Sequence, residues 1–199
     1  MKKFLKHCNR GLLLGLAVLL GLIIYLKIDG MRFEKSKAEI ENTVTEYLTE
    51  VKEVNLAPAS ERSAQCQALL ERFWTSKGIP SGYYGAEKAD MSAYLDALAS
   101  QGNKTGITDY TDLYRDITVS QFGPGCAKAA LSYNVSISLD TPQADCPILG
   151  LQDGSVVYYG APPAPETSQI NQNLSLEIYL QENDGKWQIS SISAEPREE

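Results

Sequence analysis

The first apolar run of the chain is continuous. From Gly11 to Leu26 the sequence reads GLLLGLAVLLGLIIYL, without a charged side chain. Lys27 can extend its ammonium group to a membrane interface, and with it and Ile28 the run has 18 residues. A helix of that length spans about 27 Å, the short end of a bilayer crossing. The pattern therefore predicts a transmembrane helix over residues 11–28.

The residues around this run predict its orientation. Four of the first ten residues are basic, whereas all 25 acidic residues follow the run. By the positive-inside rule, residues 1–10 are expected in the cytoplasm and residues 29–199 outside it. A cleaved signal peptide would need small residues after the run, and KIDGM at 27–31 does not supply that pattern. We predict an uncleaved single-pass anchor in a cell membrane, and the short basic N-terminus is typical of bacteria.

Between residues 33 and 100 the apolar positions recur about every 3.6 residues, which predicts helices. The first is expected over 33–54. The second is expected to begin with Ser60 as its cap and to stop at Gly78, and the third covers 91–100 with Asp90 as its cap. Their apolar faces comprise Ile40, Val44, Tyr47, Leu48 and Val51 in the first, Cys66, Leu69, Leu70, Phe73 and Trp74 in the second, and Met91, Tyr94, Leu95 and Leu98 in the third.

After Gly106 the period changes to two, which is typical of half-buried strands. Strands are expected over 117–120 and 129–139, separated by a turn at 123–125, and as a C-terminal hairpin. The hairpin pairs 174–180 with 187–192 around the Asn-Asp-Gly-Lys turn of residues 183–186. Residues 156–159 form a further candidate strand, and 161–172 an exposed loop. One apolar and one polar face predict an antiparallel sheet covered on one side.

Helices first and antiparallel strands afterwards predict an α+β domain with its core over 33–193, in which the helices pack on a curved antiparallel sheet. This order of elements resembles the nuclear transport factor 2-like, cystatin-like cone superfamily. The Asp-Gly-Lys-Trp sequence at 184–187, set between two apolar strands, is frequent in the last hairpin of that superfamily. The resemblance implies a fold and leaves the function open.

Charge and composition exclude several classes of function. The 25 acidic residues face 13 basic ones from Arg32 onward, a net charge of −12. A nucleic-acid partner is therefore not expected, because basic patches supply most of that affinity. His7, the single histidine, lies before the anchor, so the exported part has neither a histidine-activated nucleophile nor the commonest zinc ligand. We predict no catalytic residue, no metal ligand and no cofactor.

Three cysteines follow the anchor, in a compartment that permits disulfides. Cys126 precedes the long strand and Cys146 follows it, so both can lie at one end of the sheet if the chain doubles back. A disulfide between them is one hypothesis, and two unpaired thiols are the other. Cys66 lies on an apolar helix face and is interpreted as a small buried hydrophobe.

An acidic run precedes the first strand, with Asp109, Asp112 and Asp116 interleaved by Tyr110 and Tyr114. A solvated segment leading into the strand is the favoured interpretation, because charge runs are usually solvated. A cation site or a carboxylate–tyrosine acid/base pair is the alternative, although the spacing does not match a calcium loop. The resemblance adds that some enzymes of the cone superfamily use an Asp base with Tyr donors in an apolar cavity.

Tyrosines also form two adjacent pairs, Tyr83–Tyr84 in a glycine-flanked loop and Tyr158–Tyr159 just before the proline-rich loop. Tyrosine is enriched at interfaces, so these four are predicted ligand or partner contacts, together with Tyr110 and Tyr114. Packing at the edge of the core is the competing interpretation.

These features predict a membrane-anchored extracytoplasmic interaction module that binds the lipid bilayer through residues 11–28 and a protein partner in the envelope. Its layout of short cytoplasmic segment, one span and exported cone domain resembles the single-pass scaffold subunits of bacterial conjugation and type IV secretion machines. That resemblance implies a scaffold or accessory subunit of a cell-envelope complex. The alternative is a small-molecule-binding cone domain or, less favoured, an Asp/Tyr-dependent enzyme, so the sequence does not favour catalysis.

Overall fold

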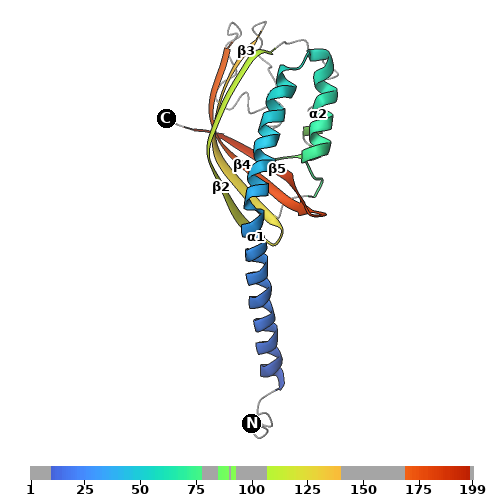
Figure 1. Ribbon diagram of the computed structural model, residues 1–199, viewed down its shortest axis with the longest axis vertical. Coiled ribbons are helices and arrows are strands. Elements are labelled where there is room, and N and C mark those ends of the chain that lie inside the picture. Colours follow the sequence, from blue (N-terminus) through green and yellow to red (C-terminus); the bar gives the residue numbers. More distant parts are fainter. Residues whose placement is uncertain (1–9, 78–84, 90, 93–106, 140–168, 198–199) are drawn as a thin grey trace. The chain divides into compact units, whose positions relative to one another are not determined.

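A computed structural model describes residues 10–77, 85–89, 91–92, 107–139 and 169–197 (Figure 1). The chain divides into two units, Met1–Lys37 and Ala38–Glu199. The elements are α1 (Arg10–Leu56), α2 (Ala59–Phe73), β1 (Ala86–Glu87), β2 (Ile107–Gly123), β3 (Cys126–Leu139), β4 (Gln169–Asn183) and β5 (Lys186–Pro196).

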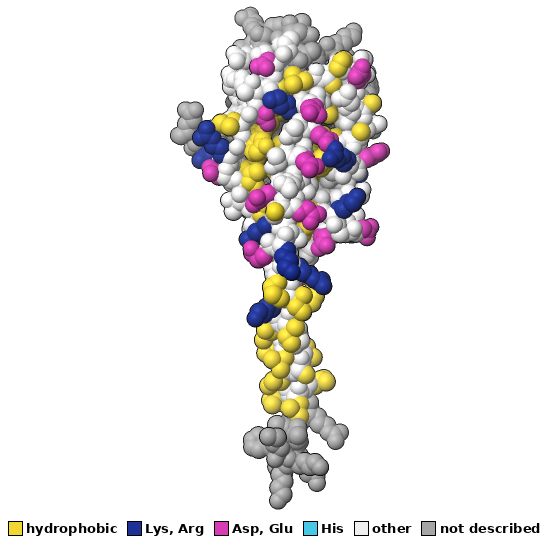
Figure 2. All heavy atoms as spheres, in the orientation of Figure 1, with side chains coloured by type: hydrophobic (Ala, Val, Ile, Leu, Met, Phe, Trp, Pro, Cys, Tyr) yellow, Lys and Arg dark blue, Asp and Glu magenta, His cyan; other side chains and the backbone are white. Residues whose placement is uncertain are grey.

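The described part of the first unit is helical and belongs to α1. Its large apolar side chains between Leu12 and Leu26 are 40% to 71% exposed, and Figure 2 shows apolar side chains gathered along this part of the helix. Within the described residues, α1 is the one helix long and apolar enough to cross a membrane, judged by length and composition alone. The helix expected over 11–28 is present as part of α1, which continues without a break into the helix expected over 33–54.

In the second unit the predicted apolar stripe of α1 is confirmed. Its five members share 0% exposure; they are Ile40, Val44, Tyr47, Leu48 and Val51. The ring of Tyr47 meets Phe73 of α2 edge-on, with centroids 5.6 Å apart. On the solvent side, the guanidinium of Arg72 bridges to Glu46 and Glu50 of α1. The two helices are thus joined by an aromatic core contact and an exposed ion-pair cluster.

The ends of α2 differ from the prediction. Its N-cap is Pro58, with no side-chain cap, so Ser60 lies inside the first turn. The ring of Pro58 fixes its φ, and its ψ is extended. Its carbonyl accepts a hydrogen bond from the N–H of Glu61 at 2.9 Å, and this bond closes the first turn without a capping side chain. Trp74 is already extended and forms a parallel bridge with Ile189 of β5. The predicted stop at Gly78 lies outside the described residues.

The described strands form one antiparallel sheet in the order β1-β5-β4-β3-β2. Figure 1 shows it curved, with α2 and the second-unit part of α1 on one face, here called the inner face. The buried residues of β3 alternate as predicted and face inward; they are Ala127, Ala129, Leu131, Tyr133, Val135 and Ile137. The α+β fold class predicted from the sequence is confirmed.

Both predicted hairpin turns are present. In the β4–β5 turn, Asp184 and Gly185 have φ values of 51° and 76°. Two successive residues in the left-handed region match the right-handed twist of a tight hairpin, and Asp-Gly tolerates that conformation best. Gly125 supplies the positive φ, 63°, in the β2–β3 turn.

Two strands are longer than expected. Strand β2 begins at Ile107 and pairs with β3 along its length, so the acidic run is part of the sheet, not a solvated lead-in segment. Strand β4 begins at Gln169, so residues 169–172 are strand and not loop. In both places polar residues occupy sheet positions, which hid the period-two pattern. Both segments are held by pairing with β3.

The third predicted helix is described only at its start. Residues 88–89 and 91–92 are helical, and Met91 is 1% exposed, as expected for its apolar face. The helix therefore begins before its expected cap at Asp90. The rest of 91–100 and the candidate strand 156–159 lie outside the described residues.

Candidate functional site

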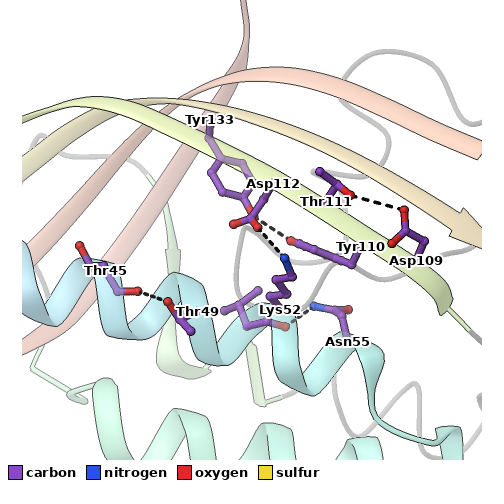
Figure 3. Close-up of polar contacts among 10 residues, drawn as sticks. Thr45, Thr49, Lys52, Asn55, Asp109, Tyr110, Thr111, Asp112 and Tyr133 are labelled. Atoms are coloured by element: carbon purple, nitrogen blue, oxygen red, sulfur yellow. Dashed lines mark hydrogen bonds and ion pairs between the residues drawn. The ribbon is translucent and has the colours of Figure 1, made fainter.

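A cluster of polar side chains lies between α1 and the inner face of β2 and β3. Tyr110 and Asp112 alternate with outward residues of β2, so both point inward. Tyr133 points inward from β3, and Lys52 and Asn55 come from the last turns of α1 (Figure 3). We call these five residues the inner polar cluster.

Hydrogen bonds and one ion pair link four members of the cluster in a chain. The hydroxyl oxygens of Tyr110 and Tyr133 are 2.8 Å apart, and the Tyr133 hydroxyl donates to Asp112 Oδ2 at 3.4 Å. The Tyr110 hydroxyl then donates to Tyr133, since the proton of Tyr133 is engaged. Lys52 Nζ lies 3.5 Å from Asp112 Oδ1. The carboxylate is thus neutralised from one side and hydrogen-bonded from the other.

Burial sets the electrostatics of the cluster. Tyr110 and Tyr133 are 2% and 0% exposed, and the Asp112 side chain is 10% exposed. Burial raises the pKa of the Tyr133 phenol, and the neighbouring Tyr110 hydroxyl and the Asp112 carboxylate raise it further. Burial likewise raises the pKa of Tyr47, nearby in the core. Both phenols therefore stay protonated at neutral pH and do not act as bases. The Tyr133 hydroxyl donates its hydrogen bond to Asp112.

Asn55 completes the cluster with an unsatisfied atom. The residue is 0% exposed, and its Nδ2 donates to the carbonyl of Val51 at 2.8 Å. Its Oδ1 is buried and has no hydrogen-bond partner among the residues that the structure describes. A buried carbonyl without a partner costs about 1–3 kcal/mol, so such atoms in a folded protein call for an explanation.

The structure brings two members of the predicted acidic run into the cluster and leaves the others outside. Tyr110 is buried and reaches Tyr133, so its ring is not part of the surface, whereas Tyr114 is half-buried. Asp109 is exposed and accepts a hydrogen bond from Thr111 at 3.4 Å. Asp116 lies at an irregularity of the ladder with a φ of 59°.

Five other predicted site residues lie outside the described residues; they are Tyr83, Tyr84, Tyr158, Tyr159 and Cys146. The contact role of the tyrosines and the Cys126–Cys146 disulfide therefore stay predictions. In the described part of the chain, no three His, Cys, Asp or Glu side chains are grouped so that they could hold a metal ion.

Sequence reasoning missed Lys52, Asn55 and Tyr133 as cluster members. A signal was present for the first two, because they continue the buried helical stripe at i+4 and i+7 from Leu48. A lysine and an asparagine on an apolar stripe indicate an inward polar partner. Tyr133 gave no such signal, since a tyrosine within an alternating strand looks like any core aromatic.

Comparisons with solved structures define the class of fold. A protein assigned as a scytalone dehydratase from Novosphingobium aromaticivorans matches with a TM-score of 0.51 at 7% identity, over 86% of this chain and 89% of that one. A nuclear transport factor 2-like superfamily protein from Salmonella enterica matches with a TM-score of 0.50 at 9% identity, over 84% and 94%. The fold is therefore the nuclear transport factor 2-like, cystatin-like cone.

A third similar structure is an IcmL-like type IV secretion system protein from Legionella pneumophila, with a TM-score of 0.46 at 12% identity, over 82% of this chain and 94% of that one. Its TM-score is lower than those of the other two structures. The sequence itself matches no protein-family model and no curated protein. The similarity is thus one of fold alone.

Proposed function

We propose that the protein is a single-pass, membrane-anchored module whose cone domain lies outside the cytoplasm and binds a protein partner in the cell envelope. The observation that carries this proposal is the apolar surface of α1 between Leu12 and Leu26, where every large apolar side chain is at least 40% exposed. An exposed apolar surface of this size is unfavourable in water and favourable in a lipid bilayer.

The inner polar cluster supports binding as the role of the domain in preference to catalysis. Asp112, its inward carboxylate, is paired with Lys52 and hydrogen-bonded by Tyr133. The hydroxyls of Tyr110 and Tyr133 are engaged with one another, and burial raises the pKa of the Tyr133 phenol. A general base needs an available lone pair near a substrate, and this carboxylate is already committed on both oxygens. The cluster instead ties α1 to the sheet.

The proposal is tested by placing the full chain, with a C-terminal tag, in bacterial cells. We expect the protein to stay in the membrane after a high-salt wash, and the tag to be digested when protease is added to intact spheroplasts. Replacing Leu16 and Leu19 together by Arg should release the protein from the membrane, because each charge at mid-span costs about 2.5–3.5 kcal/mol of insertion. Leu56→Arg, at an apolar residue 42% exposed in the second unit, is the matched control and should leave the protein in the membrane.

Two outcomes would overturn the proposal of a membrane anchor. One is a wild-type protein that washes off the membrane. The other is a protein that is released after about 28 N-terminal residues have been cleaved off as a signal peptide. The partner is tested in the same cells by crosslinking. A single discrete adduct that is present for wild type and Leu56→Arg supports the proposal, and a chain that remains uncrosslinked and monomeric contradicts it.

Binding of a small molecule inside the cone is a second candidate, favoured by the unpartnered Oδ1 of Asn55. Sites that bind ligands often retain polar groups that are unfavourable for stability. We expect Asn55→Leu to raise the free energy of unfolding by up to about 1 kcal/mol, because it removes an unsatisfied buried carbonyl. Thr75→Val is the matched control: Thr75 is 6% exposed and its hydroxyl accepts the N–H of Lys77, so its loss should destabilise. Urea unfolding measures both, and a destabilised Asn55→Leu would remove the argument for this candidate.

A further inference from the structure

The outer face of the sheet, opposite α1, carries a groove of about 400 Å³ that crosses β2, β3 and β4. The residues that project into it from the outer face are Thr111, Leu113, Asn134, Ser136, Asn171 and Asn173. They alternate along their strands with inward residues such as Asp112 and Tyr133, which contact α1 or one another. The groove is therefore separated from the inner polar cluster by the thickness of the sheet.

The strand register arranges these six side chains in two rows. Thr111 lies opposite Ser136, which lies opposite Asn171. In the next outward-facing row, Leu113 lies opposite Asn134, which lies opposite Asn173. Each row crosses three strands about 4.8 Å apart, and the two rows are about 7 Å apart along the strands. The groove floor is thus a regular grid of short side chains.

The side chains that project into the groove are uncharged and mostly polar, whereas most of the accessible surface of the groove is carbon. Five of its six outward side chains are amides or hydroxyls, and the sixth, Leu113, is 46% exposed. Asp112 also borders the groove, but its carboxylate is engaged by Lys52 and Tyr133 on the inner side. In a chain with a net charge of −7, a neutral grid of this kind is a distinct surface.

The amides in the groove have free hydrogen-bonding capacity. Within the described part of the chain, the side-chain amides of Asn134, Asn171 and Asn173 make no hydrogen bond to another protein group, and Asn173 Oδ1 is buried without a partner. Each amide offers two donors and an acceptor. Asn134 and Asn171 are exposed, so their amides can exchange bound water for the hydroxyls of a ligand.

The lining selects among classes of ligand. An anion or a cation would find no compensating charge in the groove, and would lose hydration without a partner. A lipid-like or aromatic ligand would contact the carbon surface but would leave the five amides and hydroxyls without hydrogen-bond partners. A neutral polyhydroxylated chain fits both features, because each hydroxyl donates and accepts as the amides require, while the C–H face of a sugar ring can rest on Leu113. We propose that this groove binds a short segment of a neutral glycan.

The groove volume of about 400 Å³ agrees with a short glycan segment as the ligand, since small-ligand sites range from about 300 to 1,000 Å³. The inference goes beyond the proposed envelope function and does not depend on it, because glycan binding is a property of the folded sheet. A second copy of the chain laid face to face on the sheet is the main competing occupant, and the experiment below separates the two.

The test uses the purified full-length protein in phospholipid nanodiscs, because detergents with sugar head groups would compete. Cellotetraose, maltotetraose and chitotetraose are the probes, each titrated by calorimetry. We expect at least one to bind, and Asn171→Ala and Asn173→Ala each to weaken that binding about tenfold, as expected for the loss of one or two hydrogen bonds. Ser120→Ala is the matched control, because Ser120 is exposed on the outer face of β2 but does not line the groove, and it should bind as wild type does.

Each variant is also unfolded in urea, so that loss of binding is separated from loss of fold. Binding weakened equally by Ser120→Ala would overturn the proposal, as would the absence of binding to all three tetrasaccharides at millimolar concentration. A dimer that Asn171→Ala and Asn173→Ala dissociate, without any glycan binding, would overturn it too and would assign the groove to a second copy of the chain. The membrane-topology experiments can fail without affecting the glycan-binding result. Glycan binding can likewise fail without affecting the proposed membrane topology.

Discussion

Raising the pH from 10 to 12 is expected to lower the free energy of unfolding of the cone domain by about 5 kcal/mol. Tyr47 and Tyr133 are both 0% exposed, and burial raises the pKa of each phenol. The folded state keeps both protons, whereas the unfolded chain releases them above its ordinary tyrosine pKa of about 10. The unfolded state then binds fewer protons, so stability falls as pH rises. Each phenol contributes about 1.4 kcal/mol per pH unit.

The measurement is urea unfolding of the full chain at several pH values between 9 and 12, followed by tryptophan fluorescence. The two tryptophans, Trp74 and Trp187, are 1% and 7% exposed, so both report on the cone domain. Tyr133→Phe should reduce the dependence by about 1.4 kcal/mol per pH unit, because one titrating group is lost. A Tyr133→Phe protein that keeps the full wild-type slope would contradict the assignment.

Leu131→Ala is the matched control for that experiment. Leu131 is 4% exposed on the same strand and face as Tyr133, but it does not titrate. Its truncation should lower stability by about 2–5 kcal/mol at every pH and leave the slope unchanged. A change of slope in this variant would show that the alkaline loss reflects general destabilisation.

The parts of the fold that the sequence predicted depend on local patterns. The buried stripe of α1 could be read from spacing alone, because one helix face repeats every 3.6 residues. The Asp184-Gly185 turn could be read from two adjacent residues, since few pairs tolerate left-handed φ in succession. These features need no knowledge of what packs against them.

The start of β2 could not be read in this way, because its inner face is polar. Tyr110 and Asp112 occupy positions where the alternation rule expects apolar side chains, and contacts with Lys52 of α1 and Tyr133 of β3 make those positions favourable. Lys52 lies 60 residues earlier in the chain than Asp112. A compensation between residues so far apart is a tertiary property, and a run of alternating aspartates and tyrosines then resembles a solvated segment.

The outer groove was missed for the opposite reason. Short polar side chains are what the alternation rule expects on a solvated face, so Asn134, Asn171 and Asn173 looked ordinary. Their significance depends on the register of three strands, which places them side by side around a groove. Residues 169–172 were also expected in a loop, so Asn171 was not assigned to the sheet at all. Register is set by long-range pairing, and a single strand's pattern does not carry it.

Trp74→Ala is expected to cost about 3–5 kcal/mol of unfolding free energy, a large share of the 5–15 kcal/mol typical of a domain. The side chain is 1% exposed and meets Tyr47 edge-on, with ring centroids 6.2 Å apart. Its backbone bridges to Ile189 of β5, and the next residue donates its N–H to the Ile189 carbonyl at 2.8 Å. Trp74 is therefore where the end of α2 is fixed to both α1 and the sheet.

Urea unfolding followed by the fluorescence of the remaining Trp187 measures this loss. Trp74→Phe should recover part of it, because a smaller aromatic ring can still contact Tyr47 while leaving some space unfilled. Leu56→Ala is the control for truncating a large apolar side chain, since Leu56 is 42% exposed, and it should change stability by less than about 0.5 kcal/mol. If Trp74→Ala costs no more than that control, the contact between α2 and the sheet does not stabilise the domain.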